Sequence, residues 1–249
     1  MVDTRGGSAH DRFTQERDAP AATASLATIG AVSALVSVLM FLLGIAFMAS
    51  SGVEVLIPET GESGRDWIQD VDGAGGAFYA GAWLGIFGGV LGLVGLIGFY
   101  AALRQVGSWF ILAPVLGAFG LTLVTISHLI PIAMAYELVP DYTADANASL
   151  ASTADTLASL ALLLNYTGDV VAWGVVVPMY AIAILRTSAL PRWLGWLGLV
   201  VGVFAGLGYA LSPASGVIEG LTFIGFVVFF VWIASMGVSI LRRRQRFAT

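Results

Sequence analysis

Long apolar runs alternate with short polar segments along this chain, and the lengths of the runs predict helices that cross a membrane. A helix needs about 20 apolar residues to span roughly 30 Å of hydrocarbon. Only helices and closed barrels satisfy their own backbone polar groups inside a bilayer. The pattern predicts an all-α, polytopic membrane protein with six transmembrane helices in one bundle, at residues 25–49, 77–103, 109–136, 157–185, 193–211 and 217–241.

The same pattern divides the chain into three parts. Residues 1–24 form a polar N-terminal tail, residues 25–241 the six-helix transmembrane domain, and residues 242–249 a basic C-terminal tail. The first apolar run is too long for the core of a secretory signal peptide, and the segment before it is rich in acids. We therefore expect this run to be a retained helix.

The distribution of arginine predicts how the chain is oriented. Positively charged residues are retained on the cytoplasmic side of a membrane. The opposite side holds Arg65 and most of the acidic residues. We therefore expect both termini in the cytoplasm. The protein is expected to be a multi-pass protein of the cell (inner or plasma) membrane of a prokaryote. The other arginines fall in the tails and in alternate loops: Arg5, Arg12, Arg17, Arg104, Arg186, Arg192, Arg242, Arg243, Arg244 and Arg246.

Composition narrows the chemistry that is available. Hydrophobic residues make up 58% of the chain and charged residues 11%, which excludes an ordinary soluble domain. All 11 basic residues are arginine, so a Schiff base on lysine is impossible. The absence of cysteine excludes thiolate chemistry, disulfides and iron–sulfur clusters. The chain has only two histidines, which are too few for a bis-histidine haem within the membrane because one of them lies in the polar tail. We therefore predict no cofactor, no metal site and no catalytic residue.

Glycines recur every three or four residues in two of the predicted spans. This spacing places them on one face of a helix, where a missing side chain lets another backbone approach closely. The two spans are predicted to be central packing helices through Gly85, Gly88 and Gly92 in one and Gly195, Gly198 and Gly202 in the other. The lipid bilayer is the expected partner, and the glycine faces would also admit a membrane partner subunit or a second copy of the chain.

A short motif precedes the fifth span. The segment 188–195 reads Ser-Ala-Leu-Pro-Arg-Trp-Leu-Gly. Proline suits a first helical turn, and the arginine and tryptophan suit a membrane interface. The segment resembles the start of a late helix in a bacterial six-helix integral membrane family that is catalogued as a domain of unknown function. The resemblance implies a six-helix fold and brings no catalytic residues with it.

Two ionisable residues lie deep within predicted spans. Such residues are costly in a bilayer and each one suggests a functional site. His128 and Asp169 are expected at comparable depths, and Asn165 shares the face of Asp169 because residues four apart are neighbours on a helix. Tyr136, Glu137 and Glu219 are expected at the outer rim of an outward-opening cleft. A purely structural role, with hydrogen bonds between helices, is the alternative for these residues.

Four functions stay open on the sequence. The leading interpretation is a non-catalytic helical-bundle membrane component, because reactive residues are few. The alternative is a small proton- or cation-linked transporter with a polar site around His128 and Asp169. The third is an intramembrane enzyme or lipid-modifying protein with His128 as base, and the fourth is a role in signalling or sensing. No zinc-protease motif, phosphate loop or basic nucleic-acid patch is present, so no nucleic-acid partner is expected.

Overall fold

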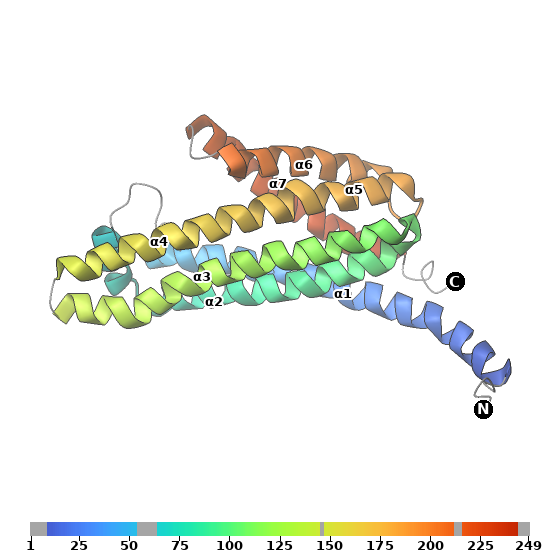
Figure 1. Cartoon of the computed structure of the whole chain (residues 1–249), viewed down its shortest axis with the longest axis horizontal. Coiled ribbons are helices and arrows are strands. Elements are labelled where there is room, and N and C mark those ends of the chain that lie inside the picture. Colours follow the sequence, from blue (N-terminus) through green and yellow to red (C-terminus); the bar gives the residue numbers. More distant parts are fainter. Residues whose placement is uncertain (1–8, 54–63, 145–146, 212–215, 244–249) are drawn as a thin grey trace, which may run out of the picture.

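The computed structural model is an elongated bundle of antiparallel helices (Figure 1). It describes residues 9–53, 64–144, 147–211 and 216–243, with side chains except at 9–21, 207, 209 and 216–223. The helices are α1 (Ala9–Ser51), α2 (Gly64–Leu103), α3 (Leu112–Ala144), α4 (Ala148–Asp169), α5 (Val177–Arg186), α6 (Arg192–Leu211) and α7 (Gly216–Arg242). Two short 3₁₀ turns, η1 (Arg104–Val106) and η2 (Ser108–Ile111), join α2 to α3, and a π-helix, η3 (Val170–Val176), joins α4 to α5.

Five helical segments of the described chain are long and apolar enough to cross a membrane, and a shorter apolar helix accompanies them. The five are Ala22–Ser51, Gly64–Val106, Ser108–Ala144, Ala148–Arg186 and Ile224–Arg242, and the shorter one is Arg192–Gly206. Large apolar side chains such as Val115, Leu163 and Trp196 are exposed on the outside of the bundle. A surface of this kind suits contact with lipid rather than with water.

Several helices extend beyond the apolar runs. The helical rod Ala148–Arg186 has 39 residues, about 58 Å at 1.5 Å per residue, against about 30 Å of hydrocarbon. The predicted N-terminal tail is helical from Ala9. Helix α2 begins at Gly64 and has a kink at Gly75 (φ 60°, ψ −153°), two residues before the predicted start of the span at residue 77. The polar stretch before residue 77 is helical because its apolar residues follow a helical period and are buried: Trp67, Ile68, Val71 and Ala74.

The first two helices form a tightly packed antiparallel pair. A Cβ on Gly98 would overlap the backbone of Gly30, and a Cβ on Gly88 would lie 3.0 Å from the ring of Phe41. Ser37 Oγ donates to the carbonyl oxygen of Gly88 at 2.6 Å. Gly85 differs from its neighbours in the stripe: a Cβ there would meet nothing within 4 Å, although its backbone nitrogen would lie 3.4 Å from a Cβ on Gly44.

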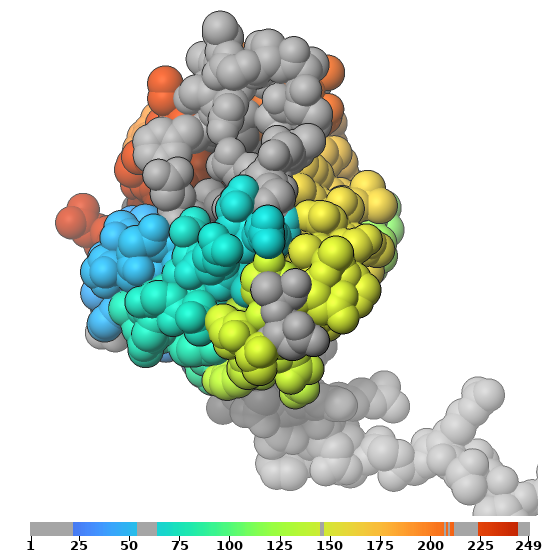
Figure 2. Space-filling model, turned by 90° about the vertical axis from the view of Figure 1, so that its left-hand side faces the viewer, coloured from blue at the N-terminus to red at the C-terminus, as the bar shows by residue number. Residues whose placement is uncertain are grey.

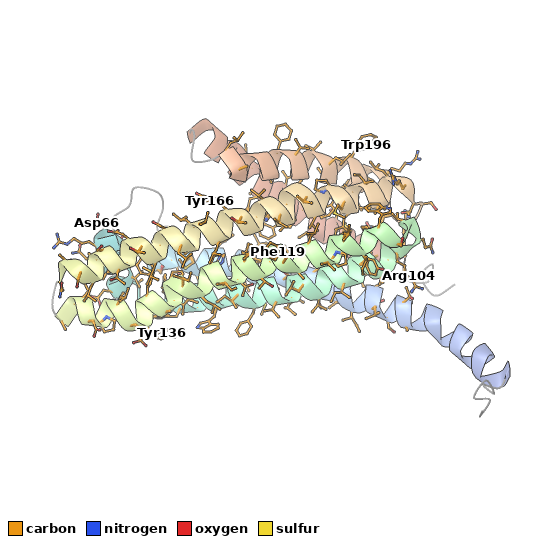
Figure 3. All side chains as sticks on the ribbon, in the orientation of Figure 1. Asp66, Arg104, Phe119, Tyr136, Tyr166 and Trp196 are labelled. Atoms are coloured by element: carbon orange, nitrogen blue, oxygen red, sulfur yellow. The ribbon has the colours of Figure 1, made fainter. Side chains whose placement is uncertain are left out.

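The second glycine series packs α6 against the preceding helical rod and against α7. A Cβ on Gly195 would lie 2.6 Å from Leu185, one on Gly198 2.8 Å from the indole nitrogen of Trp232, and one on Gly202 2.5 Å from Pro178. The prediction of close packing therefore holds for these three glycines. Central placement does not hold for α6, which lies along one edge of the bundle and exposes Trp196 and Val200 (Figure 3).

Asp66 and Arg104 lie at opposite ends of the bundle (Figure 3). Arg104 lies at one end, where Arg186 stacks over Trp109 at 5.8 Å and Arg243 donates to the carbonyl of Ala189. We call this the arginine end. The other end, with Asp66, is called the acidic end. Several charged residues that entered the orientation prediction lie outside the described part of the chain: Arg5, Glu54, Glu59, Glu62, Asp145, Arg244 and Arg246.

At the acidic end the helices hold one another through polar contacts. The carboxylate of Asp155 accepts the backbone N–H of Gly64 at 2.5 Å, which caps the N-terminus of α2 from another helix. Arg65 Nε donates to the hydroxyl of Tyr142 at 2.7 Å. Figure 2, viewed from this end, shows the start of α2 packed beside the adjoining ends of α3 and α4. The acidic end is therefore an ordered extension of the bundle.

Candidate functional site

A cavity of about 430 Å³ lies between the helices. Its lining comes from α1, α2, α3, α4, η3, α5 and α7, so it is enclosed by most of the bundle rather than by one pair of helices. Its glycine wall is Gly81, Gly85, Gly89 and Gly92 of α2. The open space at Gly85 is this cavity, which explains why a Cβ on Gly85 would meet nothing within 4 Å.

Close contact between α3 and α4 positions the polar part of the wall. A Cβ on Gly168 would lie 2.6 Å from the carbonyl oxygen of Gly120, and a Cβ on Gly120 would lie 2.8 Å from that of Gly168. The two backbones therefore meet directly beside Asp169. This contact brings His128 of α3 and both Asn165 and Asp169 of α4 to the same cavity.

A chain of hydrogen bonds links α3 to the buried acid. Ser127 Oγ shares its one proton between the carbonyl oxygen of Val124 at 2.6 Å and Asn165 Oδ1 at 3.2 Å. Asn165 Nδ2 donates to Asp169 Oδ2 at 2.8 Å. Asn165 and Asp169 thus share a helix face, as their spacing predicts. Ser127 is completely buried and Asp169 is 5% exposed. Because an amide neither gains nor loses a proton readily, Asn165 orients the carboxyl group and does not relay protons to it.

His128 hydrogen-bonds within its own helix rather than with Asp169. Its Nδ1 lies 2.6 Å from the carbonyl oxygen of Val124, which can only accept, so Nδ1 carries a proton. Ser127 Oγ is 3.3 Å from the same nitrogen. In the neutral imidazole Nε2 is then an acceptor. His128 and Asp169 are therefore neighbours on one cavity wall, linked through Ser127 and Asn165.

The helix changes form immediately after Asp169. Residues Val170–Val176 are a π-helix, a wider turn that is frequent at functional sites. Pro178 follows it and has no N–H to donate to the preceding turn, which the wider π-helix accommodates. The side chain of Trp173, inside this segment, hydrogen-bonds to the carboxyl group of Asp169. The π-helix thus places an indole beside the buried acid.

Aromatic rings continue the wall from Trp173 onto α7. The ring of Trp173 lies 3.9 Å from that of Phe229 and 5.4 Å from that of Phe226, centroid to centroid. Phe226 in turn meets Phe230 at 4.6 Å, and Phe41 of α1 lies 5.7 Å from Phe230. All five rings line the cavity. Asp169 therefore stands at one end of a continuous aromatic surface.

The predicted outer rim is not part of this cavity. Tyr136 is 55% exposed and its ring stacks on Tyr79 at 4.8 Å, while Glu137 is exposed on the same helix, and neither residue is in the lining. The reason is their helix face: α3 turns these positions away from the bundle axis. The side chain of Glu219 lies outside the described residues.

Metal binding has no support in the described residues. No group of three or more histidine, cysteine, aspartate or glutamate side chains is gathered there in a way that could hold an ion. Sequence reasoning missed Ser127, Trp173 and the phenylalanines of α7. Serine and aromatic residues are common in membrane helices, and the π-helix changes which of them face the cavity.

Comparisons with protein-family models, with curated proteins and with solved structures found no match to this chain. The resemblance of segment 188–195 to a six-helix family therefore stays a prediction. Any function has to be argued from the cavity itself.

Proposed function

We propose that this protein is a six-span membrane protein of a prokaryotic cell, with both termini cytoplasmic, that binds a small molecule in its interior as a small transporter would. Counting the shorter apolar helix Arg192–Gly206 with the five longer segments gives six spans, and an even number leaves both termini on one side of the membrane. The arginines in both tails favour the cytoplasm as that side. The arginine end would face the cytoplasm and the acidic end the exterior.

One observation carries the functional part of the proposal: a buried acid lies on the wall of an open cavity. A helical bundle that acts only through packing has no need of a carboxyl group beside empty space, because burying a polar group without use is costly. Asp169 is held there by Asn165 and Trp173. The cavity, at about 430 Å³, falls in the range of small-molecule sites. This favours a transporter over the non-catalytic bundle that the sequence suggested first.

Ligand-induced stabilisation tests the proposal. Purified protein is heated with a panel of amphiphiles of matched chain length bearing an amine, a quaternary ammonium, an alcohol or a phosphate, and the unfolding temperature is recorded. A ligand that binds the folded state raises this temperature. Gly85→Phe places a ring in the cavity, and Val90→Phe, on the exposed face of the same helix, is the matched control.

We expect at least one amphiphile class to stabilise the native protein and the Val90→Phe variant but not the Gly85→Phe variant. Equal stabilisation of all three, or of none, would contradict an internal site. The cavity would then be a packing defect in a structural bundle.

A further inference from the structure

Most of the side-chain hydrogen-bond donors in the described wall of the cavity already bind acceptors within the protein. The hydroxyl group of Tyr180 donates a hydrogen bond to the carbonyl oxygen of Leu96 at 2.8 Å. The indole N–H of Trp232 donates one to the carbonyl oxygen of Leu194 at 2.8 Å. Ser37 donates to Gly88, and His128 Nδ1 to Val124. A ligand that needs several donors, such as a carboxylate or a phosphate, therefore finds few in this wall.

Acceptors remain available in the same wall. A carboxylate has about four lone-pair sites, and the contacts from Asn165 and Trp173 to Asp169 occupy two of them. No arginine or lysine lies among the described residues that line the cavity. Among the described residues that line the cavity, Asp169 thus has no arginine or lysine to pair with, although buried charges are normally paired.

The apolar walls suit the body of a flat or branched aromatic ligand. Trp173, Phe226, Phe229 and Phe230 present ring faces and edges next to Asp169. Ring faces attract cations, with tryptophan the strongest. On α1, Ile45 lines the cavity and is 48% exposed, so the apolar wall continues to the outside of the bundle.

From these contacts we propose that the ligand is a lipophilic organic cation, whose positive charge pairs with Asp169 while its apolar body lies on the aromatic wall. The assignment rests on the proposed function, namely that the cavity admits a solute. It adds the chemical class of that solute. The ionised carboxylate supplies a negative charge that pairs with the cation where water is excluded. The aromatic rings cover the apolar surface of the ligand and keep it out of water.

Two ions of nearly identical shape and opposite charge make the test sharp. Binding of tetraphenylphosphonium and of tetraphenylborate is measured by equilibrium dialysis on the full-length protein in nanodiscs, with empty nanodiscs subtracting partition into lipid. We expect saturable binding of the phosphonium and none of the borate. This comparison requires no variant, so it holds even if an altered Asp169 fails to fold.

Substitution then locates the charge that matters. Asp169→Asn should weaken phosphonium binding at least about tenfold, whereas Asp141→Asn, which removes an exposed acid at the acidic end, should leave it unchanged. Asp169→Glu should retain part of the binding. Unchanged binding in Asp169→Asn, equal binding of the borate, or no saturable binding of the phosphonium would overturn the assignment.

The two proposals fail in different ways. If an alcohol or phosphate amphiphile stabilises the native protein but not Gly85→Phe, and the phosphonium does not bind, the internal site stands and its cationic specificity is wrong. If no amphiphile distinguishes Gly85→Phe from Val90→Phe, the internal site itself is wrong.

Discussion

Gly206 of α6 lies directly against Gly174 of the π-helix, so closely that a Cβ on Gly206 would overlap the Cα of Gly174. This contact fixes the edge helix to the segment that carries Trp173. It also means that the π-helix is braced from outside the cavity while Asp169 and Trp173 face its interior. The shape of the site therefore depends on a glycine that takes no part in it.

Replacing Gly206 with alanine should destabilise the protein. The added methyl group forces the two backbones apart, and overpacking of this kind costs about 1–3 kcal/mol. Gly85→Ala is the matched control, since its methyl group enters open space and alanine favours a helix by up to about 1 kcal/mol over glycine. Thermal unfolding in detergent, followed by tryptophan fluorescence, compares the two. Equal unfolding temperatures would show that the Gly174–Gly206 contact is looser than described.

The hydrogen-bond chain between α3 and α4 predicts unequal losses of stability when Asn165 and Ser127 are replaced. Asn165→Leu removes one donor to Asp169 and one acceptor for Ser127, while Trp173 and the Val124 carbonyl remain as their other partners. Losing these two hydrogen bonds, one of them to an acid, should cost about 1–3 kcal/mol. Ser127→Ala should cost less, because Asn165 keeps its contact with Asp169. Unfolding of both variants in the same detergent checks the order. A larger loss from Ser127→Ala would mean that the contact with Asp169 is not the stronger one.

Asp155 is expected to hold the first turns of α2 in place. Asp155→Ala removes the acceptor of the Gly64 N–H, and loss of such a cap costs about 1 kcal/mol. Hydrogen exchange should accelerate in the segment from Gly64 to Gly75, with little change in the rest of the bundle. Asp141→Ala, at an exposed position of α3, serves as control and should leave exchange in this segment unchanged. Unaltered exchange in Asp155→Ala would refute the capping role.

The orientation of the chain can be read by thiol labelling, because the protein has no cysteine of its own. A membrane-impermeant maleimide added to intact cells should label Asp141→Cys at the acidic end. Ser188→Cys, in the connection between α5 and α6, should react only after the membrane is opened. The reverse pattern would place the arginine end outside and overturn the proposed topology.

The helical architecture follows from the sequence because each apolar run is long and each polar break is short. The same reasoning placed Asn165 and Asp169 on one face, since α4 keeps a regular period up to Asp169. Beyond that residue the π-helix changes the register, so the position of Trp173 beside the acid could not be obtained from regular spacing. Pro178 indicates an irregular backbone in this part of the sequence, but it does not indicate that the irregularity is a π-helix.

The cavity itself could not be predicted, because glycine has the same appearance in sequence whether it packs or lines empty space. Gly88 and Gly85 lie in the same stripe, and one meets Phe41 while the other meets nothing within 4 Å. The difference depends on how α1 crosses α2, which is a tertiary property. For the same reason Tyr136 and Glu137 were assigned to a rim that the orientation of α3 turns away from the site.

Accessibility of the cavity wall is the most direct test of an internal binding site. Gly85→Cys is reacted with a small, membrane-permeant maleimide in nanodiscs, and the labelled fraction is measured by mass spectrometry with Asp141→Cys as the exposed reference. We predict that Gly85→Cys is labelled and that an amphiphile that stabilises the native protein slows this labelling without affecting Asp141→Cys. A thiol at position 85 that stays unreactive while the variant remains folded would show that the cavity is closed to solutes and would contradict the account.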